Sequence, residues 1–233
     1  MTFDFAEMWA HMPLLGKLIA LSLAAMMVSF VGVTLERVIA FARSAKESRS
    51  FAARAGELLE EWRLEELVTL ASQHPSSTLA KVVGPIVGRY VRACQDGGAE
   101  GLSPAELARS EGERRQEAVG EDLRRGMNVI ATVGSLAPFV GLLGTVVGII
   151  GAFQGIGAAG SAGIAPVMRG ISEALIETAF GLLVAIPAVI AFNYLNARIS
   201  AIETALGRSS SELLEQLEQH RDRSSSRRAT RAA

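Results

Sequence analysis

No charged residue occurs from Gly126 to Gly155. A helix needs roughly 20 apolar residues to cross the hydrocarbon core of a bilayer, and this stretch exceeds that length. Two further blocks are similar: one runs from Leu18 to Leu35, and the other lies between Glu177 and Arg198. The chain has a hydrophobic content of 49% and a mean hydropathy of +0.30, and its longest apolar runs lie in these blocks. The sequence therefore predicts an all-α membrane protein with three transmembrane helices.

Basic residues predict the orientation of these helices. Arg37, Arg43, Lys46 and Arg49 closely follow the first apolar block, and Lys and Arg concentrate on the cytoplasmic side of transmembrane helices. The first helix should therefore begin outside and end in the cytoplasm. A cleaved signal peptide is the alternative, but the extreme N-terminus is acidic rather than basic and the block is long for such a peptide.

The expected segments follow in chain order. They are an outer N-terminus at 1–13, a transmembrane helix at 14–41, a cytoplasmic helical domain at 42–128, a second transmembrane helix at 129–155, an outer loop at 156–167, a third transmembrane helix at 168–195, and a cytoplasmic C-terminal helix with a basic tail at 196–233.

The region predicted to be cytoplasmic is rich in Ala, Leu, Glu and Arg, which favour helices. Turn-forming residues predict breaks at His74-Pro75, at Gly84-Pro85 and after Asp96. The stretch from Ser103 to Glu106 has the pattern of a capping box with proline at the first helical position, so a long helix should begin there. Since no turn signal follows, this helix is expected to continue into the second transmembrane helix.

The C-terminal region divides into two parts. Apolar residues recur at helical spacing from Ile199 to Leu217, which predicts an amphipathic helix. Residues 221–231 are basic and low in complexity, and are therefore predicted to be disordered. Such a tail could also touch anionic lipid on the cytoplasmic side.

Composition excludes several classes of function. A formal net charge of -1 argues against nucleic-acid binding. One cysteine, Cys94, allows no internal disulfide, and the three histidines are far apart in the sequence, so no metal or cofactor site is expected. The sequence contains no phosphate-binding glycine loop, nucleophile elbow or HExxH motif. The chain is therefore not expected to be an enzyme.

Small residues gather on one face of the second and third transmembrane helices. At 100° per residue the second helix places on one side Gly134, Ala137, Gly141, Gly144, Thr145, Gly148, Gly151, Ala152 and Gly155, and large residues such as Phe139 and Leu143 on the other. The third helix has a similar narrow face of Gly170, Ala174, Thr178, Gly181, Ala185 and Ala188. Faces of this kind let helix backbones approach closely, so Gly141, Gly144, Gly148 and Gly181 are candidate packing residues.

Glu173 and Glu177 stand at the start of the third transmembrane helix, with Glu177 beside its small-residue face and Glu173 on the flank of that face. An acid within a membrane is costly, so it is expected to face protein or a water-filled path and to serve a function. Since desolvation disfavours the charged form, such an acid could hold or relay a proton. The alternative is a salt-bridged stripe with Arg169 at the helix entrance. The helix from Glu173 to Asn196 is roughly 34 Å long, which would leave Glu173 near the outer surface and Glu177 about one turn deeper.

Two sequences within these helices resemble a known family. Residues 134–150 (GSLAPFVGLLGTVVGII) and 171–193 (ISEALIETAFGLLVAIPAVIAFN) are similar to the MotA/TolQ/ExbB proton channel family, and closest to its ExbB and TolQ branch. By position, Glu173 corresponds to the family's buried glutamate, and Thr145 and Thr178 to its polar threonines. Glu177 is a departure, since that branch has a small residue such as alanine there. The resemblance leaves open whether one acid or two serve the pore.

The resemblance implies a function. Subunits of the family form a ring, here expected to be a pentamer, in the inner membrane around two helices of a single-span partner such as ExbD or TolR, each with an essential aspartate. Proton flow then drives work on a TonB-like or TolA-like envelope protein. The resemblance thus implies a proton pathway through Glu173, Thr145 and Thr178, and the cost of an acid within the membrane adds Glu177 to this expected pathway. The basic flanks of the apolar helices predict a periplasmic N-terminus and a cytoplasmic C-terminus.

Two alternatives remain. The chain could belong to a gliding-motility motor of the same family, or it could be a membrane scaffold for an envelope complex that conducts no protons. The threonines also have a simpler interpretation, because a threonine in a membrane helix often bonds only a carbonyl of its own helix.

Overall fold

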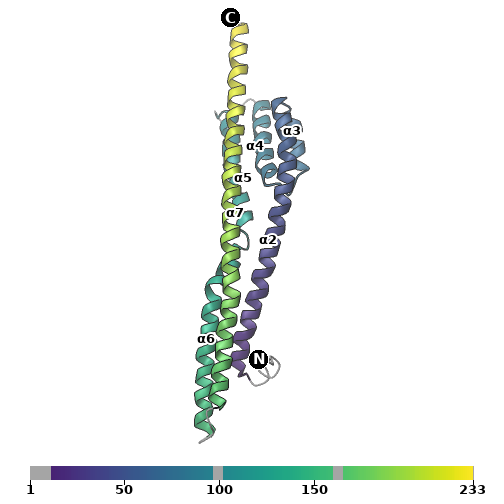
Figure 1. The fold of residues 1–233 in the computed structure, drawn as a ribbon. Helices are drawn as coiled ribbons and strands as arrows, with labels where there is room; N and C mark the ends of the chain where they lie inside the picture. Colours follow the sequence, from purple (N-terminus) through teal and green to yellow (C-terminus); the bar gives the residue numbers. More distant parts are fainter. Residues whose placement is uncertain (1–11, 97–101, 160–164, 233) are drawn as a thin grey trace. The chain divides into compact units, whose positions relative to one another are not determined.

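The computed structural model describes residues 12–96, 102–159 and 165–232, and the side chains of these ranges apart from 155–159, 165–166, 169 and 222–232. The described part of the chain is almost entirely helical and contains no strand. The predicted all-α class is therefore confirmed. Figure 1 labels the helices: α2 (Leu14–Glu60), α3 (Leu64–Ser72), α4 (Thr78–Gln95), α5 (Pro104–Arg124), α6 (Met127–Ala159) and α7 (Ala165–Ala232).

Three helices are long and apolar enough to cross a membrane. Their most apolar windows, in α2, α6 and α7, have mean hydropathies of 2.3, 2.1 and 2.2. The chain divides into two compact units. We call residues 1–36 and 126–195 the membrane unit, because they contain these apolar stretches, and residues 37–125 and 196–233 the polar unit.

The membrane unit exposes its large apolar side chains. Phe139, Leu143 and Ile150 of α6 are 67%, 52% and 51% exposed, whereas Ala137 is completely buried. The same division holds in α7, where Leu183 is exposed and Ala188 is buried. A surface of this kind suits lipid or other membrane helices rather than water. The predicted segregation of large and small residues on α6 is thus present in the fold.

The predicted continuation of the capped helix into the membrane is wrong. α5 ends at Arg124 and α6 begins at Met127, with Gly126 between them at φ +79°. A side chain at this position would be strained, because φ is in the left-handed region. It would also lie 2.8 Å from Val33 of α2. In the sequence this break is marked by a single glycine. Its need for glycine depends also on the contact with Val33, which is distant in the chain.

In the polar unit, α4 packs against α3 and α5. The capping box is present: Ser103 Oγ accepts from the amide of Glu106, and the Glu106 carboxylate accepts from the amide of Ser103. The predicted break at Gly84-Pro85 is wrong, since both residues lie inside α4. Gly84 instead permits close packing with α3, because a Cβ there would lie 2.6 Å from the Ala71 side chain.

The C-terminal part of α7 buries its apolar face in the polar unit. The buried residues at helical spacing are Ile199, Leu206, Leu213, Leu214 and Leu217, as the amphipathic pattern predicts. Arg124 of α5 pairs with Glu203 at 2.8 Å, and Arg109 pairs with Glu218 at 3.0 Å. The predicted disorder of residues 221–231 is wrong, since α7 is helical to Ala232.

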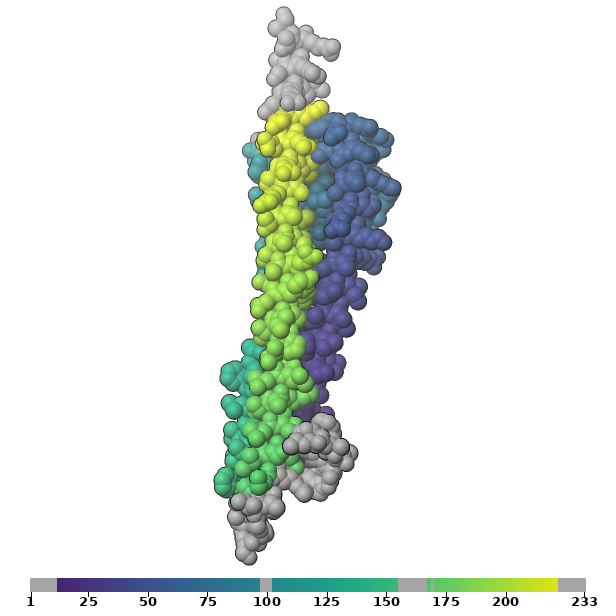
Figure 2. Space-filling view, in the orientation of Figure 1, coloured from purple at the N-terminus to yellow at the C-terminus, as the bar shows by residue number. Residues whose placement is uncertain are grey.

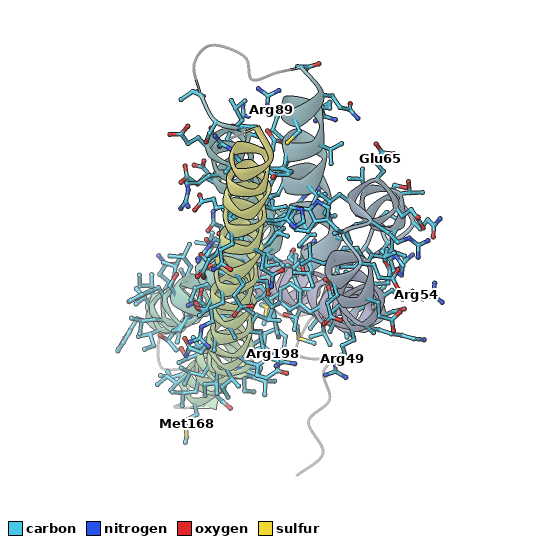
Figure 3. The ribbon with its side chains drawn as sticks, turned by 90° about the horizontal axis from the view of Figure 1, so that it is seen from above. Arg49, Arg54, Glu65, Arg89, Met168 and Arg198 are labelled. Carbon is cyan, nitrogen blue, oxygen red and sulfur yellow. The ribbon has the colours of Figure 1, made fainter. Side chains whose placement is uncertain are left out.

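Charged side chains cover the outside of the polar unit. Figure 3 shows Arg49, Arg54 and Glu65 pointing away from α2 and α3. α2 ends at Glu60, and Trp62 in the turn that follows has φ +58°. The amide of Trp62 donates to the Leu59 carbonyl, and that of Arg63 to the Leu58 carbonyl. This pair of bonds is the Schellman motif that closes many helices, with tryptophan where glycine is usual.

Candidate functional site

The small-residue faces of α6 and α7 lie against each other in the membrane unit. A Cβ on Gly141 would lie 3.2 Å from the Cα of Gly181, and a Cβ on Gly181 would lie 2.7 Å from the Ala137 carbonyl oxygen. A Cβ on Gly148 would lie 2.7 Å from that of Ala174. Figure 2 shows the teal surface of α6 beside the green surface of α7. Such contacts exclude larger residues, because the neighbouring atoms belong to backbone or short side chains.

Glu177 lies within this contact. Its residue surface is only 8% exposed, although it is an acid in an apolar helix. Its carboxylate occupies the space beside Gly144, so closely that a Cβ on that glycine would overlap Oε2. A Cβ on Gly16 of α2 would lie 3.1 Å from Oε1 of the same carboxyl group. The acid is therefore enclosed by α2 and α6 as well as by its own helix.

Glu173 has a different environment. It lies one helical turn before Glu177 on α7 and is only partly buried. The structure therefore separates the two acids: Glu177 is in the interior of the chain, and Glu173 is at its edge. Sequence reasoning placed Glu177 beside the small face and Glu173 on its flank, but it did not identify Gly16 as a neighbour. Gly16 was a single glycine in an apolar helix, which is a weak signal.

The two threonines also differ. Thr178 Oγ1 donates to the carbonyl oxygen of Gly141 at 2.9 Å, which links α7 to α6. Thr145 Oγ1 donates to the Leu142 carbonyl of its own helix at 2.7 Å, and Thr145 is buried. The simpler interpretation, in which a threonine bonds only a carbonyl of its own helix, therefore describes Thr145 but not Thr178.

Other predicted features fall outside this arrangement. A Cβ on Gly151 would meet nothing within 4 Å, so this glycine does not take part in the close packing. The surroundings of Gly155 and the side chain of Arg169 lie outside the described part of the structure, and so does the salt-bridged stripe that Arg169 would form with the two acids. Among the described residues, no group of three or more His, Cys, Asp or Glu could hold a metal ion.

Comparison with known proteins identifies the family. The profile described as the MotA/TolQ/ExbB proton channel family matches residues 83–207, more than half of the chain. The chain belongs to this family. The match includes α6 and the acid-bearing part of α7, together with helices of the polar unit.

Curated proteins named biopolymer transport protein ExbB are similar to this chain. A biopolymer transport protein ExbB from Salmonella typhimurium strain LT2 is 43% identical over 102 residues, which cover 44% of this chain and 42% of that protein. One from Xanthomonas campestris pv. campestris strain B100 is 40% identical over 136 residues, 56% of this chain and 53% of that protein. One from Neisseria gonorrhoeae is 46% identical over 71 residues, 30% and 32% respectively. The chain spans about half or less of the length of these relatives. It is thus an ExbB-like member of the family and a membrane protein.

Proposed function

We propose that this chain is a ring-forming subunit of an inner-membrane motor driven by the proton-motive force. With a single-span partner resembling ExbD or TolR, it converts proton flow into mechanical work on a TonB-like or TolA-like envelope protein. The ring is a pentamer. The observation that carries this proposal is the pair of acids on α7, with Glu177 buried in a contact between apolar helices.

The chemistry of these acids supports proton transfer. Placing a carboxyl group inside a membrane costs free energy, so such a group generally has a partner or a function. Glu173 lies partly exposed at the edge of the chain, where it can meet another subunit or the partner helix. We assign the proton pathway to Glu173, Glu177, Thr145 and Thr178. Gly141, Gly144, Gly148 and Gly181 hold α6 and α7 close enough to form it.

The membrane orientation follows from the charges that flank the apolar helices. Arg43, Lys46 and Arg49 follow the apolar part of α2, and Arg124 and Arg125 precede α6. Since basic residues concentrate on the cytoplasmic side, we propose a periplasmic N-terminus and a cytoplasmic C-terminus in the inner membrane. Labelling of single cysteines placed at Leu14 and Glu212, in a background where Cys94 is serine, would test this orientation with a membrane-impermeant thiol reagent in intact cells.

Measurement of proton flux tests whether the chain forms a proton-conducting complex with its partner. The chain is purified with its single-span partner, placed in liposomes and subjected to a proton gradient. The intact complex should conduct protons, and Glu173→Gln should lower the flux at least tenfold. The control is Glu212→Gln, which removes an exposed acid of the same helix in the polar unit and should leave the flux unchanged. A correctly assembled complex without flux under any condition would favour a non-conducting scaffold.

A further inference from the structure

Glu177 is the buried acid of the described part of the chain. The other buried polar residues there are Arg37, Ser44, Ser77, Thr145 and Ser210, none of which has a carboxyl group. Oε2 of Glu177 has no hydrogen-bond partner within the described structure. A buried polar atom without a partner is uncommon in a folded protein and calls for a ligand or another explanation.

Two glycines from different helices shape the space around this carboxyl group. Gly144 of α6 borders Oε2, and Gly16 of α2 borders Oε1. Any side chain at Gly144 would take the place of the carboxyl group, whereas one at Gly16 would press against it at 3.1 Å. We call this space, defined by Gly16, Gly144 and Glu177, the carboxyl socket. It lies entirely within the membrane unit and within one chain.

No positive charge compensates Glu177 in the described residues. On α2, Lys17 follows Gly16, but no ion pair joins it to Glu177. α6 carries no titratable side chain between Met127 and Gln154. On α7 itself the neighbouring charges are Glu173, one turn away, and Arg169, whose side chain is not described. A carboxylate with a buried and unpaired oxygen would bear the full cost of desolvation, whereas the neutral acid would not.

We infer that the carboxyl socket binds a proton, so that Glu177 is a neutral carboxylic acid in the closed membrane unit. This is a second proton site, inside each subunit and separate from Glu173 at the edge. Release of the proton would leave a charged group in a space enclosed by α2, α6 and α7, so α2 must separate from α6 and α7, or water must enter, when Glu177 ionises. The role of this site in a motor rests on the proposed function, but its proton can be measured without proton flow.

Infrared spectroscopy of the purified full chain at neutral pH tests the assignment. A neutral carboxylic acid has a C=O stretch above the amide I band, and this band shifts in deuterated water. We expect the band in the wild type and in Glu173→Gln, and its loss in Glu177→Gln. Absence of the band from the wild type would overturn the proposal, and so would its persistence in Glu177→Gln. Loss in both variants would mean that the two acids share one proton, which also contradicts a separate site.

The shape of the socket is tested by a double-substitution cycle. Gly144→Ala should lower the melting temperature of the protein because the new methyl group takes the place of the carboxyl group. Glu177→Ala removes the carboxyl group but keeps a Cβ that would lie 2.9 Å from the new methyl group, so Gly144→Ala should have a smaller effect in its presence. Equal effects of Gly144→Ala in the two backgrounds would show that the carboxyl group does not occupy the socket. Because this readout needs neither partner nor gradient, it stays informative if the motor proposal fails.

Discussion

Thr178 donates a hydrogen bond from Oγ1 to the main-chain carbonyl of Gly141, 2.9 Å away on the facing helix. The bond lies where Gly141 and Gly181 bring the backbones of α6 and α7 together. A threonine hydroxyl has a short reach, so it can bond a neighbouring helix only where small residues permit such an approach. Packing and polar contact therefore depend on the same glycines.

Replacement of Thr178 by valine should cost about 0.6 kcal/mol of stability, the average for a hydrogen bond between membrane helices. Valine keeps the shape of threonine but cannot donate to the Gly141 carbonyl. The control is Thr145→Val, which removes a bond that lies within α6 and should change stability less. Unfolding of the purified protein with increasing denaturing detergent measures both. If Thr145→Val destabilises the protein as much as Thr178→Val, the bond between helices is not the source of the effect.

Gly181→Ala should destabilise the membrane unit by about 1–3 kcal/mol, the usual cost of overpacking. Its Cβ would lie 2.7 Å from the Ala137 carbonyl oxygen and 3.0 Å from the Gly141 Cα. These are backbone atoms, so they cannot move aside without shifting a helix. Gly151→Ala is the matched control, because nothing lies within 4 Å of that Cβ and alanine favours a helix over glycine. A comparable loss in both variants, measured by detergent unfolding, would contradict the packing argument.

Much of this fold could be predicted from the sequence because the decisive signals are local. Uninterrupted apolar residues indicate helices that cross a membrane, and the spacing of small residues indicates which face of α6 meets another helix. The capping box at Ser103 depends on residues within one turn. The proximity of Glu177 to the small face could likewise be read from its position on α7.

The features that could not be predicted from the sequence depend on contacts between residues that are distant in the chain. The sequence around Gly84 predicts a break, but this glycine leaves room for Ala71 inside α4. Gly126 separates α5 from α6 and lies beside Val33. Gly16 borders Glu177 from a helix far away in the sequence. No pattern within one helix reveals such partners. The partial exposure of Glu173 fits its predicted place on the flank of the small-residue face rather than the buried position that the family resemblance implies.

Glu111 links stability to pH in the polar unit. Its carboxylate accepts from Arg115 at 2.7 Å and from Arg114 at 2.6 Å. The hydrogen bond with Arg115, aided by the charges of both arginines, lowers the pKa of Glu111 below its ordinary value of 4.5. A lowered pKa in the folded state means that the contribution to stability is present above the unfolded pKa and is lost as the pH falls through the folded pKa.

Glu111→Gln should therefore lower stability at neutral pH, by about 0.5 kcal/mol for each exposed pair. The difference from the wild type should shrink as the pH falls through the lowered pKa of Glu111, because the wild-type carboxyl then also becomes neutral. Thermal unfolding followed by circular dichroism over a pH series measures this difference in stability. Glu113→Gln is the control, because this exposed neighbour has no ion pair among the described residues. A difference that stays constant down to low pH would mean that the ionic contacts do not stabilise the polar unit.

Trp62 closes α2 at φ +58°, where a residue with a Cβ is strained. Its ring also stacks on His220 of α7, with centroids 3.5 Å apart and planes inclined by 11°. Trp62→Ala and Trp62→Gly both remove this stack. The difference in stability between the two variants therefore reports only the cost of the left-handed backbone conformation. We expect the glycine variant to be more stable than the alanine variant by about 1 kcal/mol, because glycine adopts this conformation without strain. Thermal unfolding of the two variants measures the difference. Equal stability, or greater stability of the alanine variant, would show that the left-handed conformation does not persist once the ring is removed.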